Sequence, residues 1–219
     1  MTDTVMKTSA KTNNSTRKKG EKIKVGFFAI TAKIFRVITV PPVMVSALFT
    51  ILYAARRDIY SSLSQLFISI LFLGILPVLA YPAVELFPAL KKNRRESERN
   101  FAFIFTAIGY IGGAVYALAA NLSRDLTFVY YAYLFSAMLL IICNKVIKLR
   151  ASGHSCSITG PILLLLTLTG WQFIGPCAAV FAGVLWSSLY LKRHTLKEIT
   201  LGALSAALGM VISLLIFLV

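Results

Sequence analysis

The chain has 219 residues, of which 58% are hydrophobic and 14% are charged, whereas an average soluble domain has about 25% charged residues. A soluble fold of this length would expose more apolar surface than it could bury, so this composition excludes a soluble globular domain. The net charge is +15, but the basic residues flank apolar segments, which favours anionic lipid headgroups and phosphate over nucleic acid as partners.

The first 24 residues are polar and rich in Lys, Thr and Asn, and we expect residues 1–24 to form a disordered basic tail. They are not a typical signal peptide, because Lys33 and Arg36 interrupt the apolar residues that follow and no small-residue cleavage site is evident. Residues 25–36 are predicted to form an interfacial helix that leads into an integral membrane domain, residues 25–219.

Five later segments have the length of about 17–25 apolar residues that a membrane-spanning helix needs. They are residues 37–55, 63–87, 101–120, 127–143 and 199–219. The sequence therefore predicts an all-α fold, a polytopic bundle of helices that lies in a lipid bilayer and crosses it several times.

Residues 156–191 are long for one span and short for two, with Gly170 near the middle. One long tilted helix and two short helices joined at Gly170 both fit this length. Two crossings would place basic residues 192–197 on the same face as the N-terminal tail and the basic loops 91–99 and 145–150, as the positive-inside rule favours. We therefore expect six to seven spans, with the N-terminus and these loops on the cytoplasmic side.

Two smaller patterns fall within the predicted spans. Gly109, Gly112 and Gly113 are predicted to allow close helix packing. The tyrosines in residues 130–133 are predicted to form an interfacial aromatic belt. The three cysteines lack the spacing of metal ligands, so we expect them to be small buried side chains.

The chain has two histidines, His154 and His194, and both fall in loops that the predicted topology places on the basic face. Glu198 follows His194 by four residues, a spacing that puts both side chains on one face of a helix. The carboxylate could hold one ring nitrogen and leave the other as a nucleophile. The same spacing also fits an ordinary pair at a helix start, where the helix dipole favours Glu.

Two further segments could bind phosphate. Ser152 and Gly153 precede an apolar helix, where an N-cap and free backbone N–H groups bind anions. Lys92 and Arg99 are seven residues apart, on one helical face, as cations around a transferring phosphate would be. A stop-transfer cluster that only sets topology would have the same composition as this second segment.

In order and spacing, these segments resemble the signature of the type 2 phosphatidic acid phosphatase and vanadium haloperoxidase superfamily. That signature is Lys, six residues, Arg-Pro; then Pro-Ser-Gly-His; then Ser-Arg, five residues, His, three residues, Asp. The corresponding residues are Lys92 and Arg99-Asn100; Ala151-Ser152-Gly153-His154; and Ser187-Ser188, His194 and Glu198. The resemblance covers residues 92–198, about half of the chain.

The resemblance implies a membrane phosphatase, without metal or other cofactor, that acts on phosphatidate, phosphatidylglycerophosphate or a polyprenyl mono- or diphosphate. If this chain works as the family does, His194 would attack phosphorus and form a phosphohistidine. Glu198 would orient His194, and His154 would protonate the leaving oxygen. The implied phosphate ligands are Lys92, Arg99, Ser152 and Gly153.

Four positions depart from the family pattern. Asn100 and Ala151 replace prolines, Glu198 replaces Asp, and Ser188 replaces an arginine that binds phosphate in the family. The candidates to replace that arginine are Arg193, Arg150 and Lys148. Two alternatives stay open: a degenerate relative that binds lipid phosphate without hydrolysing it, and a small transporter or scaffold whose basic loops only set topology.

Overall fold

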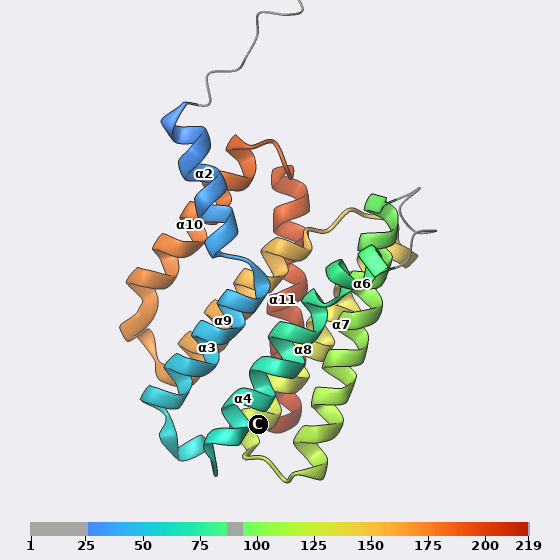
Figure 1. Ribbon diagram of the computed structural model, residues 1–219. Coiled ribbons are helices and arrows are strands. Elements are labelled where there is room, and N and C mark those ends of the chain that lie inside the picture. The colour runs from blue at the N-terminus through green and yellow to red at the C-terminus, as the bar shows by residue number, and fades with distance from the viewer. Residues whose placement is uncertain (1–25, 87–93, 219) are drawn as a thin grey trace, which may run out of the picture.

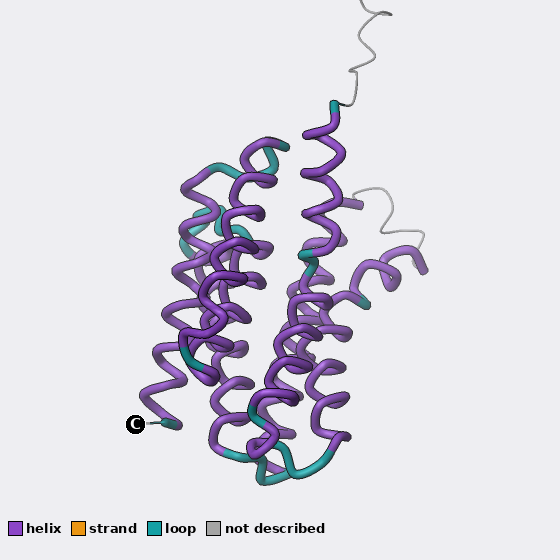
Figure 2. The backbone as a smooth tube through the Cα atoms, turned by 90° about the vertical axis from the view of Figure 1, so that its left-hand side faces the viewer, coloured by secondary structure: helices purple, strands orange, loops and turns teal. Residues whose placement is uncertain are grey.

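The structure, a computed structural model, describes residues 26–86 and 94–218. These residues form helices and no strands, and the helices lie side by side in one bundle (Figures 1 and 2). The predicted tail, residues 1–24, lies outside the described residues. The helices and helical turns are α2 (Phe27–Ile38), α3 (Pro41–Ala55), η1 (Arg57–Ile59), α4 (Leu63–Ile70), η2 (Leu71–Ile75), α5 (Leu76–Val78), α6 (Ala80–Leu86), α7 (Arg94–Ala119), α8 (Arg124–Ile141), η4 (Ile142–Val146), α9 (Gly153–Thr169), η5 (Trp171–Phe173), α10 (Ile174–Tyr190) and α11 (Leu196–Phe217).

The described residues contain four helices that are long and apolar enough to cross a membrane: Asn100–Ala119, Arg124–Val146, Trp171–Tyr190 and Leu196–Phe217. Two bent pairs, α2 with α3 and Leu63–Val78 with α6, raise the number to six when each pair is one span. The shorter apolar helix α9 adds 17 residues. The all-α polytopic membrane bundle is thus confirmed, with a number of spans close to the predicted six to seven.

The predicted lead-in helix is present as α2, which is bent by 58° from α3. Pro41 begins α3, where a proline is tolerated because the first N–H groups of a helix have no partner within it. Helix α2 packs against α10: a Cβ built on Gly183 would collide with the ring of Phe35. The absence of a side chain at Gly183 therefore lets α2 lie close to the bundle.

The segment 156–191 forms two helices, α9 and α10, as the distribution of loop charge predicted. The chain reverses at Gly170, whose φ of 85° lies in a region that side-chain-bearing residues rarely adopt. Glycine is also the commonest residue just after a helix C-terminus. The interpretation as one long tilted helix is therefore wrong.

The connections between helices separate into two groups at opposite ends of the bundle (Figure 1). One end carries the start of α2, the loop from η4 to α9 and the loop from α10 to α11. The other end carries the connection from α3 to α4, the connection from α7 to α8, and Gly170. The basic loops 147–152 and 191–195 therefore share one end, which we call the basic end.

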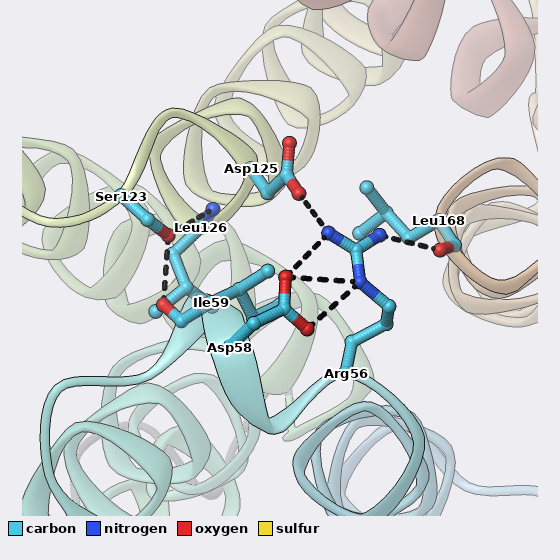
Figure 3. Close-up of polar contacts among 7 residues, drawn as sticks. All are labelled: Arg56, Asp58, Ile59, Ser123, Asp125, Leu126 and Leu168. Atoms are coloured by element: carbon cyan, nitrogen blue, oxygen red, sulfur yellow. Dashed lines mark hydrogen bonds and ion pairs between the residues drawn. The ribbon is translucent and has the colours of Figure 1, made fainter.

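At the opposite end, Arg56 joins three parts of the chain (Figure 3). Its guanidinium donates hydrogen bonds to Asp58 at 2.9 Å, to Asp125 of α8 at 2.7 Å and to the carbonyl oxygen of Leu168 in α9 at 2.8 Å. Ser123, the N-cap of α8, donates to the carbonyl oxygen of Ile59 at 2.8 Å. These contacts hold α3, α8 and α9 together where each of them reaches this end.

The glycine prediction is confirmed, because Gly109 faces the backbone of Phe72 and Gly113 faces the ring of Tyr130 with no room for a Cβ. The aromatic-belt prediction is wrong for Tyr130 and Tyr133, which are buried between helices. The hydroxyl of Tyr130 shares a hydrogen bond of 2.8 Å with Ser69 Oγ, which satisfies its polar end inside the bundle.

Candidate active site

A cavity of about 730 Å³ extends inward from the basic end, between α2, α7, α8, α9 and α11. The polar residues that line it include Arg36, Glu98, Asn144, Lys145, Arg150, His154, His194 and Glu198. The apolar residues include Val40, Pro77, Ala132, Leu164, Ala206 and Met210. Met210 follows Glu198 by twelve residues on α11, about 18 Å along the helix axis, so the cavity joins a polar mouth to an apolar interior.

His194 and Glu198 form a hydrogen-bonded pair at the mouth of this cavity. His194 Nδ1 lies 2.9 Å from Glu198 Oε2, and Glu198 Oε1 lies 3.6 Å from Arg150 Nε. A capping box explains why Glu198 is in place: Thr195 Oγ1 accepts from the Glu198 N–H, and Glu198 Oε2 accepts from the Thr195 N–H. The carboxylate thus engages Nδ1 and leaves Nε2 as the ring nitrogen available for chemistry.

His154 lies in the first turn of α9, before the apolar part that begins at Cys156, and lines the same cavity. Its Nε2 is buried and has no hydrogen-bond partner among the described residues. Burial, together with the smaller effects of the nearby charges of Arg36 and His194, lowers the pKa of His154 to about 4. The ring is therefore neutral at pH 7 while the cavity holds no anion.

The two segments that carry the histidines are fixed to each other. The Ser152 N–H donates to the Glu198 carbonyl at 2.8 Å, and Ser155 Oγ donates to the Ile199 carbonyl at 2.8 Å. A Cβ built on Gly202 would collide with the Ser152 carbonyl, so glycine is what allows this approach. Segments more than 40 residues apart in the sequence therefore meet in one fixed register, with both histidines facing one cavity.

The predicted phosphate ligands are placed as follows. Gly153 lines the cavity. Ser152 is buried beside it, and its Oγ accepts the N–H of Ser155 as the N-cap of α9. Lys92 lies outside the described residues. Arg99 belongs to α7, and its neighbours Glu98 and Ala102 on that helix line the cavity. The side chain of Arg99 itself is outside the described part of the chain.

Position 188, where the phosphatase pattern has an arginine, is a serine in this chain, and its side chain is buried in α10. Of the three candidate replacements, Arg150 lines the cavity, whereas Arg193 and Lys148 are absent from its described lining. Arg36, which the sequence interpretation assigned only to a lead-in helix, does line it. The available signal was a basic residue in an apolar helix just before the prolines that begin α3.

The described residues contain no group of three or more His, Cys, Asp or Glu side chains placed to hold a metal ion. No protein-family model, curated protein or solved structure matches the chain. The assignment of a function therefore depends on the chemistry of the cavity and on the residues that line it.

Proposed function

We propose that this protein is a membrane phosphatase that hydrolyses a lipid-linked phosphate through a phosphohistidine intermediate on His194. One observation carries the proposal: the His194–Glu198 pair and His154 line one cavity that is cationic at its mouth and apolar inside. A nucleophile held by a carboxylate, with a second group for proton transfer, is a recurrent arrangement in covalent catalysis. The resemblance of three sequence segments to a phosphatase superfamily supports the same assignment.

In the first step, the lone pair of His194 Nε2 attacks phosphorus and the bond between phosphorus and the lipid oxygen breaks. His154 donates a proton to that oxygen, which leaves as a lipid alcohol or a lipid phosphate. The neutral His154 must first gain this proton, and the negative charge of a bound phosphate favours the protonated ring. Glu198 stabilises the positive charge that His194 acquires.

In the second step, water attacks phosphorus and the bond between phosphorus and His194 breaks. His154, now neutral, accepts the proton of the attacking water, and inorganic phosphate leaves. The acid of the first step is thus the base of the second, and the site returns to its starting state. The substrate's hydrocarbon portion would occupy the apolar part of the cavity, near Leu164 and Met210.

We propose that the basic end faces the cytoplasm. The N-terminal tail carries Arg17, Lys18 and Lys19, which belong to none of the three phosphatase-like segments, so they report on orientation independently of the site. The loops 147–152 and 191–195 lie at the end of the bundle where α2 begins. The substrate phosphate would then be drawn from the cytoplasmic leaflet.

The test is phosphate release from a panel of lipid phosphates by the purified full-length protein and by His194→Ala. We expect release by the wild type, its loss in His194→Ala, and an acid-labile phosphohistidine in the wild type alone. Lys197→Ala is the matched control, because Lys197 is exposed and adjacent to Glu198 but does not line the cavity. Undiminished release by a folded His194→Ala protein would refute the proposal.

A second function is favoured by Ser188, which leaves the third segment without its arginine. In that case the protein binds lipid phosphate and does not hydrolyse it. Binding of the lipid panel without any phosphate release, together with hydrolysis gained by Ser188→Arg, would identify this function. A transporter or scaffold would instead keep its function in both His154→Ala and His194→Ala.

A further inference from the structure

We propose that Arg36 binds the substrate phosphate and supplies, from α2, the guanidinium that position 188 of α10 lacks. This inference rests on the proposed phosphatase function, whose site it extends by one ligand. None of the three phosphate-binding segments of the sequence contains Arg36, so the spacing of those segments does not identify it.

The first argument is an unsatisfied donor. Arg36 lines the cavity together with His154 and His194, and its Nη1 is buried without a hydrogen-bond partner among the described residues. A buried charged donor without a partner is costly, and a guanidinium can donate five hydrogen bonds in one plane. A phosphate in the cavity would accept such bonds in pairs, which is the geometry that arginine provides and lysine does not.

The second argument is the local balance of charge. The charge of Arg193 acts on Arg36, and both are cations. Of the carboxylates that line the cavity, Glu198 is engaged by His194 and Arg150. Arg36 and Arg193 therefore repel each other while Glu198 is held by other partners, and a phosphate in the cavity would offset this repulsion.

The third argument is position. Helix α2 packs against α10, the helix that carries Ser188, through the contact of Phe35 with Gly183. Phe35 is the residue before Arg36, so this contact fixes the backbone from which the guanidinium extends. The Arg193 N–H donates to the Ser188 carbonyl at 3.0 Å, and Arg193 is also close enough to Arg36 for their charges to interact. Position 36 of α2, which has a guanidinium, and position 188 of α10, which lacks one, thus lie at the same end of neighbouring helices.

The experiment compares Arg36→Ala and Arg36→Lys with Lys33→Ala in the full-length protein. Lys33 is exposed on the same helix and does not line the cavity, so its removal controls for the loss of one positive charge from α2. We expect Arg36→Ala to lower kcat/KM for the lipid phosphate by about 10- to 100-fold, the usual effect of losing a hydrogen bond to a charged group. Arg36→Lys should recover only part of this loss, and Lys33→Ala should match the wild type.

Binding of inorganic phosphate, measured by calorimetry, separates this inference from the phosphatase proposal. Phosphate bound about 10-fold more weakly by Arg36→Ala than by Lys33→Ala supports the ligand role, even if no lipid is hydrolysed by any form. Unchanged kcat/KM and unchanged phosphate binding in Arg36→Ala would overturn the inference and leave the phosphatase proposal intact.

Two further variants keep the test decisive. If Arg36→Ala does not fold, Arg36→Gln keeps most of the side-chain volume without the charge, and the same losses are expected of it. In the Arg36→Ala background, Ser188→Arg is expected to restore at least part of the phosphate binding. A folded double variant that binds phosphate no better than Arg36→Ala would contradict the claim that position 36 substitutes for position 188.

Discussion

Both carboxylate oxygens of Glu198 contact other residues, and the length of the glutamate side chain allows this. Oε2 contacts His194 and the Thr195 N–H, while Oε1 faces Arg150. The family pattern has the shorter Asp at this position. Glu at the third position of α11 can both close a capping box and reach the ring of the residue before the cap.

Exchanging Glu198 for Gln removes the charge and lets an amide N–H face His194 Nδ1. This would favour the tautomer with a proton on Nε2, which is not nucleophilic, so we expect kcat to fall on the order of 10²- to 10⁴-fold with little change in KM. Glu198→Asp should retain more activity than Glu198→Gln. Steady-state kinetics on the lipid substrate provides the measurement, and equal activities of the two variants would contradict an orienting role for the carboxylate.

The pKa of about 4 for His154 predicts a dependence of stability on pH. In the unfolded chain a histidine gains its proton near pH 6.5, whereas the native ring stays neutral down to about pH 4, so the unfolded state binds more protons between these values. Acidification from pH 7 to pH 5 should therefore destabilise the native protein by about 2 kcal/mol through this residue.

The thermal unfolding midpoint of wild type and His154→Gln, followed across this pH range, checks the prediction. The wild-type midpoint should fall more steeply with acidification than that of His154→Gln, because only the wild type has a buried ring to protonate. Parallel curves for the two proteins would show that His154 is not buried in its neutral form.

At the residue scale, the sequence predicted which histidine has a carboxylate partner, because an i,i+4 pair depends only on local helix geometry. It did not predict Arg36 as a lining residue. That position depends on the 58° bend between α2 and α3 and on the contact between Phe35 and Gly183. Both are tertiary features that a local pattern of residues does not encode.

At the scale of elements, the approach of α9 to α11 depends on Gly202. A methyl group there would collide with the Ser152 carbonyl and push the start of α9 away from Glu198. We expect Gly202→Ala to lower kcat by about 10- to 100-fold, since displacements near 1 Å between catalytic groups have effects of this size. Gly175→Ala is the matched control, because Gly175 in α10 has open space around it.

Phosphate release and the thermal midpoint should be measured for both glycine variants. The expected result is a loss of activity in Gly202→Ala alone. Full activity in Gly202→Ala would mean that α9 and α11 can separate without disturbing the two histidines.

The helical elements were predictable to different degrees. Loop charge correctly divided residues 156–191 into two helices, because the positive-inside rule counts residues that lie outside the spans. Composition alone places the tyrosines of residues 130–133 at an interface. Burial of Tyr130 depends on Ser69 and Gly113, which lie on other helices, so no pattern within α8 could reveal it.

At the scale of the molecule, Arg56 lies at the C-terminal end of α3, at the end of the bundle opposite the loops that carry the cavity residues Arg150 and His194. Arg56→Ala would break the half-buried pair with Asp125 and free the Leu168 carbonyl, with an expected loss of about 1–3 kcal/mol of stability. The kcat of the folded protein should stay at the wild-type value. The thermal unfolding midpoint and kcat, measured on the same sample, test these two expectations. A large fall in kcat at unchanged stability would contradict the independence of the Arg56 contacts and the cavity.

The two-ended arrangement also predicts labelling with a membrane-impermeant thiol reagent. In a background without the three natural cysteines, Lys148→Cys and Lys197→Cys should react from one face, and Ser61→Cys and Gln172→Cys from the other. All four positions are exposed in the fold. Reaction of Lys148→Cys and Lys197→Cys from opposite faces would show that residues 156–191 cross the bilayer once.

The ends of the described chain lie on opposite sides of the bundle: α2 begins at the basic end, and α11 finishes at the other (Figure 1). Two copies of this chain joined head to tail would therefore face in opposite directions, the second inverted with respect to the first. Internal repeats of opposite orientation are known in membrane transporters. Here the inverted copy would carry its basic loops to the side opposite those of the first copy, so the two halves could not both follow the positive-inside rule. Gene duplication of this fold would thus require an added crossing or a redistribution of lysine and arginine before both halves could insert.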